Sequence, residues 1–193
     1  MVIFSNNSKR LRTTLATRSI AKIDRVDSLT VLGVTFTDKL DMHLHISSVC
    51  AMVSQTLYAI KLLQSHGLDP SSLTSASTAL IVSRLTYASP AWIGFTSAAE
   101  RAQLAACLKR ATRWGLYDSS APSLDNICIK CDKKLFNSII GNPSHVLYQL
   151  LPPEKPSFYN MRKRGHNHIL PPKLHPFSEK NFTCRMLYNR VIW

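Results

Sequence analysis

The chain has 193 residues, 45% of them hydrophobic, which is enough to bury one core and a smaller appendage. Its 24 Lys and Arg residues against 11 Asp and Glu give a formal net charge of +13, which favours polyanionic partners. No run of 18 consecutive apolar residues occurs, so we expect no membrane span. Without a recognisable signal peptide, we expect an intracellular protein, nuclear or cytoplasmic, whose five cysteines stay reduced.

The charge is concentrated at the two ends of the chain. Residues 1–25 carry six Lys or Arg against one acid, and residues 100–193 carry fifteen against six. Residues 26–99 are nearly neutral, with three cations and four acids. This pattern predicts a packed middle between two ends that contact phosphates.

Short apolar runs open the sequence and predict a small antiparallel β meander over residues 1–38. The runs are Val2–Phe4, Ile20–Val26 and Leu29–Phe36, separated by polar turn residues. Gly33 lies inside the third run, where it predicts a bulge or a close approach of another backbone.

From Asp41 the apolar spacing becomes helical, and the sequence predicts a helical bundle over residues 39–116. The apolar positions of the first helix are Ile46, Val49, Cys50, Val53, Leu57, Ile60 and Leu63. We expect Asp41 to be its N-cap and Gly67 to mark its end.

Two further helices complete the predicted antiparallel bundle. Asp69-Pro70 is expected to start the second helix, because proline fits a first turn. Its buried positions are predicted at Leu80, Ile81, Leu85 and Ala88. Pro90 is expected to stop it and Trp92 to plug the core. The third helix begins near Ser97 and buries Leu104, Leu108 and Ala111.

The third helix ends in a cluster of cations, Lys109, Arg110 and Arg113, beside Trp114. Spacings of three and four residues predict that these cations form one patch. Two interpretations remain open: the cations stabilise the negative end of the helix macrodipole, or they bind phosphates while Trp114 stacks or packs.

Beyond Gly115 the pattern weakens. A short helical extension is predicted over residues 117–151, with a buried line at Ile127, Cys131, Leu135 and Ile139. Six prolines between 152 and 176 predict an irregular, basic tail over 152–193, ending in a short helix or extended arm. Within it, Arg162, Lys163 and Arg164 form a basic run near aromatic residues, which is either a solvated loop or a phosphate contact.

The sequence offers little for catalysis or metal binding. Cys128 and Cys131 have the spacing of zinc ligands, but no second tight pair follows, so no metal site is expected and zinc remains a minor alternative. The acids are scattered, whereas two-metal phosphoryl transfer needs clustered carboxylates.

Three separated segments carry a resemblance to one family. The run Tyr87-Ala88-Ser89-Pro90-Ala91-Trp92 resembles the Y-(A/G)-x-P-x-W signature of reverse transcriptases from non-LTR (LINE-type) retrotransposons. Val31-Leu32-Gly33-Val34, followed by Leu40, His45 and Ile46, resembles the YLGV…L…HI run of that family. Downstream, Cys131–Phe136, Leu151-Pro152-Pro153 and Asn181–Tyr188 resemble its tail.

The resemblance implies a C-terminal fragment of an RNA-directed DNA polymerase: the end of the palm, a thumb-like helical bundle and the downstream tail. No Asp-Asp pair occurs in the chain, so the family's catalytic aspartates are absent and we expect no activity and no cofactor in this fragment. The implied role is to grip RNA and DNA without sequence preference. The expected contacts are Gly33, Arg101, Lys109, Arg110, Arg113, Arg162, Lys163 and Arg164. The alternative is a stand-alone helical interaction or nucleic-acid-binding protein without a polymerase role.

Overall fold

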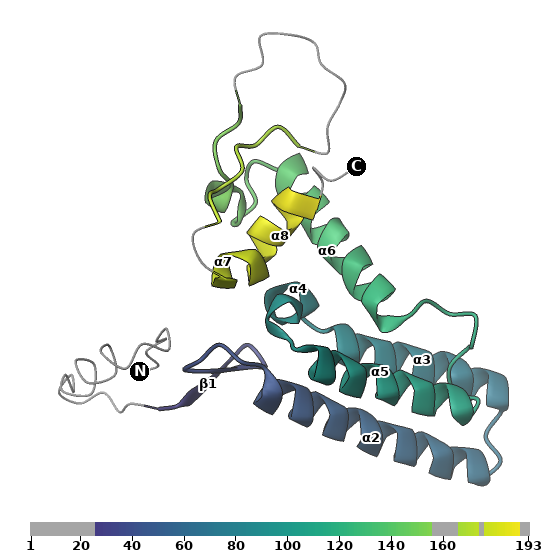
Figure 1. The fold of residues 1–193 in the computed structure, drawn as a ribbon. Coiled ribbons are helices and arrows are strands. Elements are labelled where there is room, and N and C mark those ends of the chain that lie inside the picture. The colour runs from purple at the N-terminus through teal and green to yellow at the C-terminus, as the bar shows by residue number, and fades with distance from the viewer. Residues whose placement is uncertain (1–25, 156–165, 174–175, 190–193) are drawn as a thin grey trace. The chain divides into compact units, whose positions relative to one another are not determined.

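The computed structural model describes residues 26–155, 166–173 and 176–189 and is mainly helical, as the sequence predicts (Figure 1). A two-stranded antiparallel sheet precedes the helices. The chain divides into two compact units, which are described separately below. Of the described residues, the first unit contains 26–87 and 96–121, and the second contains 88–95, 122–155, 166–173 and 176–189.

The sheet is a single hairpin of β1 (Ser28–Val31) and β2 (Val34–Thr37). Its turn is Leu32-Gly33, where both residues have positive φ, 48° and 82°. Two positive φ values are typical of the type I′ turn that suits a two-residue hairpin loop. The expectation of one strand over Leu29–Phe36 with a bulge at Gly33 is therefore wrong, because the run folds back on itself at that glycine. The earlier predicted runs, Val2–Phe4 and Ile20–Val26, lie almost wholly outside the described residues.

Helix α2 (His43–Ser65) is the central element of the first unit, because both other long helices of the unit pack against it. Its predicted apolar stripe is confirmed at Ile46, Val49, Val53, Leu57 and Ile60, all buried. Two expectations are wrong. Leu63 is 45% exposed, and the N-cap is Met42, since the Asp41 carboxylate is hydrogen-bonded to His43 Nδ1 at 2.6 Å.

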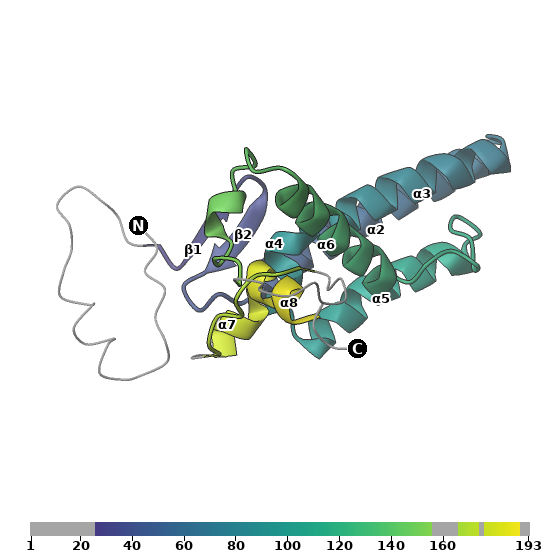
Figure 2. The same cartoon turned by 90° about the horizontal axis from the view of Figure 1, so that it is seen from above.

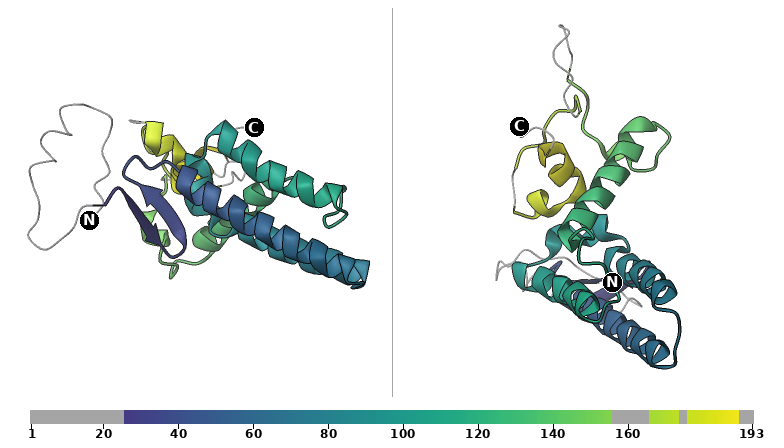
Figure 3. Two further views of the ribbon diagram at one scale, coloured as in Figure 1. Left: turned by 90° about the horizontal axis from the view of Figure 1, so that it is seen from below. Right: turned by 90° about the vertical axis from the view of Figure 1, so that its right-hand side faces the viewer.

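Helices α3 (Pro70–Thr86) and α5 (Ala98–Arg113) begin where the sequence predicts. The Asp69 carboxylate accepts a hydrogen bond from the Ser72 backbone N–H at 2.9 Å. Ser97 and Glu100 form a reciprocal capping box at the start of α5. Figure 3 (right) shows α2, α3 and α5 nearly end-on, grouped as a three-helix bundle. The caps at Asp69 and Ser97 thus fix where α3 and α5 start.

The chain leaves the bundle at Tyr87-Ala88 rather than at the proline. Helix α3 ends at Thr86, and Ala88 adopts a left-handed conformation with φ 50°. Pro90 then lies in the first turn of a new short helix, α4 (Ser89–Trp92), where a missing N–H breaks no bond. Trp92 is fully buried as predicted, but Leu80 is 45% exposed and does not belong to the buried line. The three-residue helix η1 (Ile93–Phe95) follows.

In the second unit, α6 (Leu124–Gly141) packs against α4 and α8 (Phe182–Asn189), and α7 (Pro176–Lys180) packs against α8 (Figure 2). The predicted buried line of α6 is displaced by one residue at three of its four positions, and Ile139 is buried as predicted. Buried positions are Leu124, Cys128, Asp132, Phe136 and Ile139, while Ile127, Cys131 and Leu135 are half-buried. The polar residue Asp132 inside the true line is the reason that the apolar pattern pointed to its neighbours.

The part of the proline-rich segment that the structure describes, residues 152–155 and 166–173, has no helix or strand, as predicted, but hydrogen bonds join it to itself and to α8. After the turn η2 (Tyr148–Leu150), Glu154 and His168 form an isolated antiparallel bridge. His168 Nδ1 lies 2.7 Å from the Pro152 carbonyl oxygen, and His166 Nε2 lies 2.8 Å from that of Leu187. Backbone hydrogen bonds therefore pair residues 153–155 with 167–169, His168 adds a bond within the segment, and His166 joins the segment to α8.

A buried ion pair joins the elements of the second unit. Arg185 Nη1 of α8 lies 2.7 Å from Asp132 Oδ2 of α6, and Arg185 Nη2 donates to the Pro90 carbonyl at 3.2 Å. The side chains of Arg185 and Asp132 are 18% and 7% exposed. Burial raises the pKa of Asp132, while the arginine opposes that rise. A charge this deeply buried depends on its partner.

Helix α2 also has the length and composition of a membrane-crossing helix. Its most apolar 18-residue window has a mean hydropathy of 1.4, and 28% of that window is buried within the protein. The predicted absence of a membrane partner therefore stays a prediction. The same helix buries its apolar stripe against α3 and α5, as a bundle helix does.

We expect Arg185→Met to destabilise the second unit by about 3 kcal/mol, because it leaves the Asp132 carboxylate buried without its partner. Hydrogen exchange measured by mass spectrometry on peptides of α6 and α2 reports the two units separately. Arg84→Met is the matched control, since Arg84 is exposed and its Nη1 donates to one backbone carbonyl, that of Met52. Equal losses of protection in α6 for both variants would contradict the prediction. Adding Asp132→Leu to Arg185→Met should recover part of the loss.

We expect the N-cap of α3 to make stability pH-dependent in the acid range. Hydrogen bonds from Ser71 and Ser72 lower the pKa of the fully exposed Asp69 to about 2. A lowered folded-state pKa means that this contribution is present above pH ~4 and is lost as the pH falls toward ~2. Asp69→Asn keeps a capping group without a charge. The difference in melting temperature between the parent and Asp69→Asn should therefore change between pH 4 and pH 2; a constant difference would refute the assignment.

Candidate nucleic-acid interface

Helices α2 and α5 lie parallel, so their C-terminal ends meet. Contacts between them advance in the same direction along both chains: Cys50 meets Cys107, Ser54 meets Arg110, and Lys61 meets Trp114. Each helix ends in a Schellman motif with a glycine at positive φ. In α5, the N–H of Leu116 bonds the Ala111 carbonyl and that of Gly115 bonds the Thr112 carbonyl, both at 3.0 Å. In α2, the N–H groups of Leu68 and Gly67 bond Leu63 and Gln64 in the same pattern.

Hydrogen bonds of the backbone at Trp114 and of the two residues after it hold Trp114 at this end of the bundle. It is the C-cap of α5, and its N–H bonds the carbonyls of Arg110 and Ala111. Beyond it, hydroxyl groups of α3 bond the turn: Thr74 donates to the Gly115 carbonyl at 3.3 Å, and Ser77 donates to that of Leu116. Leu116 is 1% exposed. The indole is therefore attached to a fixed backbone.

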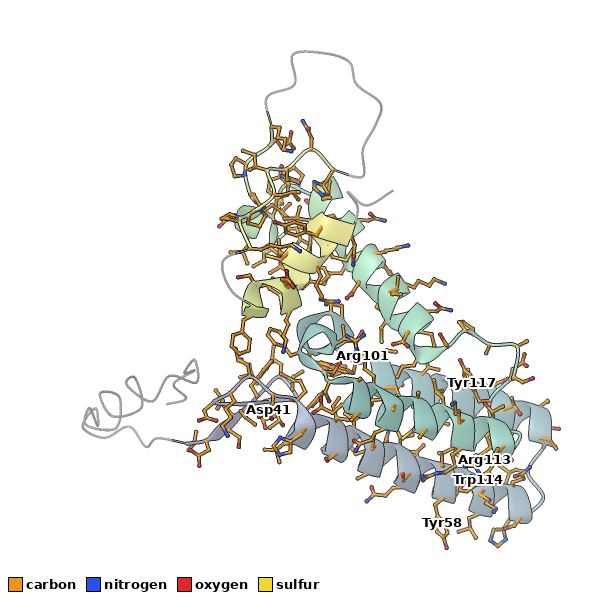
Figure 4. All side chains as sticks on the ribbon, in the orientation of Figure 1. Asp41, Tyr58, Arg101, Arg113, Trp114 and Tyr117 are labelled. Carbon is orange, nitrogen blue, oxygen red and sulfur yellow. The ribbon has the colours of Figure 1, made fainter. Side chains whose placement is uncertain are left out.

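An open groove of about 620 Å³ lies between Trp114 and the last turns of α2. Its lining residues are Tyr58, Lys61, Leu62, Gln64, Ser65 and Trp114. The Lys61 Nζ lies 4.7 Å from the centroid of the Trp114 ring, within cation–π distance. Tyr58 is 68% exposed. Figure 4 shows Tyr58, Arg113 and Trp114 at one end of the bundle and Arg101 toward the other end of α5.

The predicted patch at the end of α5 is split in two. Lys109 and Arg113 are exposed on one face, four residues apart. Arg110 is half-buried and points toward α2, where its Nη1 donates to Ser54 Oγ at 3.2 Å. Lys109 and Arg113 are therefore open to a ligand from solvent, whereas Arg110 already bonds the neighbouring helix.

Arg110 also lies beside a pair of thiols that hydrogen-bond across the α2–α5 contact. The bond to Cys107 and burial raise the pKa of Cys50. The bond from Cys50 lowers the pKa of Cys107; burial opposes this and the Arg110 guanidinium reinforces it. Arg110 thus has an electrostatic role inside the bundle, independent of any ligand.

The other predicted contacts are not part of this end. Arg101 Nε donates to Thr96 Oγ1 at 3.0 Å, and 12 residues of helix place it ~18 Å from Arg113 along the axis. Gly33 lies in the hairpin turn, where Tyr87 Oη donates to the Leu32 carbonyl at 3.1 Å. A Cβ on Gly33 would lie 3.4 Å from the Tyr87 ring, so this side of the turn faces protein. Arg162, Lys163 and Arg164 lie outside the described residues.

In the part of the chain that the structure describes, Cys128 and Cys131 are not joined by further side chains that would complete a zinc site. There, no group of three His, Cys, Asp or Glu side chains could hold a metal ion. Burial raises the pKa of Cys128 to about 11, which disfavours the thiolate that zinc needs. Both ring nitrogens of His166 and the Nδ1 of His168 are engaged with backbone groups.

Of the residues that line the groove, sequence reasoning named only Trp114; the most important of those it missed are Tyr58 and Lys61. Both lie on the exposed side of α2, and only the parallel packing of α2 and α5 brings them to Trp114. One feature of the sequence indicates a role for Lys61: it is the single Lys, Arg, Asp or Glu in His43–Ser65.

Comparison of the chain with known protein-family models, curated proteins and solved structures finds no significant match.

Proposed function

We propose that this chain binds RNA and DNA through their backbone phosphates, with little sequence preference. In this proposal it is the C-terminal part of a LINE-type reverse transcriptase and grips the template–primer duplex. The observation that carries the binding proposal is the cationic end of the bundle, formed by Lys61, Lys109 and Arg113. The polymerase assignment rests on the sequence resemblance.

Acidic side chains are absent from both helices over the stretch that forms this end. Helix α2 has no Asp or Glu, and α5 has none after Glu100. The nearest acids in the chain, Asp69 and Asp118, hydrogen-bond to serines of their own turns, which lowers the pKa of each carboxyl. Neither lines the groove. Cations without interspersed acids attract a polyanion from solution and neutralise phosphates on contact.

One of these cations, Arg113, also lies in the last turn of α5, at the negative end of the macrodipole of that helix. Such a contact contributes about 0.3–1 kcal/mol to stability, and phosphate binding does not require it to be absent. A purely structural role and a binding role differ in one measurable respect, the dependence of nucleic-acid affinity on salt.

A helical interaction protein is the second candidate, favoured by the apolar surface of α2. Several of its large side chains are between 40% and 68% exposed: Leu44, Met52, Tyr58, Leu62 and Leu63. Exposed apolar groups gathered on one helix are typical of a protein-binding surface. This candidate predicts weak binding to nucleic acid with no contribution from Lys109 or Arg113.

We expect Lys109→Gln and Arg113→Gln each to lower the slope of log affinity against log salt by about 0.9 on duplex DNA, because each removes one phosphate contact. Fluorescence anisotropy of a labelled duplex, titrated at several salt concentrations, measures the slope. Arg110→Gln is the matched control: it removes the same charge one residue away, but from a side chain that bonds Ser54. Equal slopes for the parent and the Lys109 and Arg113 variants, with lowered melting temperatures, would leave only the structural role.

We expect the purified chain to extend no primer with Mg²⁺ or Mn²⁺, because the resemblance places the metal-binding aspartates outside its 193 residues. The measurement is incorporation of labelled nucleotide on a primed RNA template. Template-dependent incorporation that persists through repeated purification would overturn the assignment of this chain as the non-catalytic part.

A further inference from the structure

We propose that the groove between α2 and Trp114 binds an unpaired base of single-stranded RNA or DNA, stacked between the side chains of Trp114 and Tyr58. This inference rests on the proposed function and adds a second kind of contact to it. Phosphate contacts at Lys109 and Arg113 hold the strand, and the groove distinguishes a strand with accessible bases from a duplex.

The indole is a pre-positioned stacking surface. The Schellman motif fixes the backbone at Trp114, and the two α3 hydroxyls fix the turn that follows. Lys61 and Trp114 both line the groove, and the Lys61 ammonium lies over the indole face. That face is therefore covered by a flexible, exchangeable side chain rather than by the core. Stacking on a fixed aromatic ring costs little conformational entropy in the protein.

The groove has the size and lining of a ligand site. A volume of about 620 Å³ falls within the range of small-molecule pockets, roughly 300–1,000 Å³. Leu62 and the two aromatic side chains supply apolar walls, and Gln64 and Ser65 supply groups that donate and accept hydrogen bonds. An aromatic base needs this combination: apolar faces to stack against and a few polar groups at its edge.

Charge selects nucleic acid over an apolar peptide as the occupant. Lys61 is the single charged residue that lines the groove, and Arg113 immediately precedes Trp114. When a base stacks on the indole, the Lys61 ammonium moves from the ring face to the adjoining phosphate. Aromatic rings together with cations that follow a backbone are typical of proteins that bind single strands without sequence preference.

The test compares two labelled oligodeoxynucleotides of equal length, one with thymine bases and one abasic, in anisotropy titrations at fixed salt. We expect the parent chain to bind the thymine strand more tightly. Trp114→Leu and Tyr58→Leu should each weaken binding of the thymine strand between about 5-fold and about 150-fold, the range of one stacked base. Binding of the abasic strand should not change. Trp114→Phe should restore much of the loss.

Tyr58→Leu keeps the test decisive if Trp114→Leu folds poorly, because Tyr58 is 68% exposed. Met52→Ala is the control on the same helix, since Met52 is 40% exposed and does not line the groove. Equal affinity of the parent for the two strands, or loss of affinity for both on Tyr58→Leu, would overturn the base site while leaving phosphate binding intact. If the parent chain binds neither strand, the proposed function itself is overturned.

Discussion

The parallel packing of α2 on α5 is the constraint from which the candidate interface follows. Parallel neighbours place two helix C-termini at one end, and with them unpaired carbonyls and the negative ends of two macrodipoles. The two Schellman motifs bond the carbonyls, and Arg110 and Arg113 in the last turn of α5 supply compensating charge at the end of that helix. Cations that stabilise a helix C-terminus also make the surface there positively charged. The binding proposals depend on this positive charge.

Local signals in the sequence predicted the frame of the first unit, because they act over a single turn of chain. Asp69-Pro70, Ser97 and Gly67 each mark a helix end without reference to tertiary structure. The groove could not be predicted in this way. Tyr58 and Trp114 come from different helices, and the direction in which α5 runs beside α2 decides whether they meet.

Errors arose where a polar or strained residue interrupts a pattern. Asp132 occupies the buried line of α6, so an apolar search shifted that line by one residue. Ala88 turns the chain by a left-handed conformation that residues other than glycine rarely adopt, so the helix end was assigned to Pro90 instead. In both places a tertiary contact supports the exception: the Arg185 pair holds Asp132, and the same guanidinium bonds the Pro90 carbonyl.

Segments that carry the family resemblance also take part in contacts within each unit. Tyr87 bonds the hairpin turn at Leu32, and Asp132 pairs with Arg185. Positions of this kind are constrained by folding itself. Their presence is therefore compatible with a thumb-like module and with a chain that has no polymerase role.

The second unit is discontinuous in sequence, because Ala88–Phe95 belongs to it although the flanking residues belong to the first. A truncation after Ala121 would therefore keep α4 and Trp92 but remove α6, the helix that α4 packs against. A fragment starting at Pro122 would lack the carbonyl that Arg185 bonds. Neither half of this protein can be obtained intact by a single cut. An insertion or deletion near Ala88 would change the connection between the two units, so we expect it to disturb both of them.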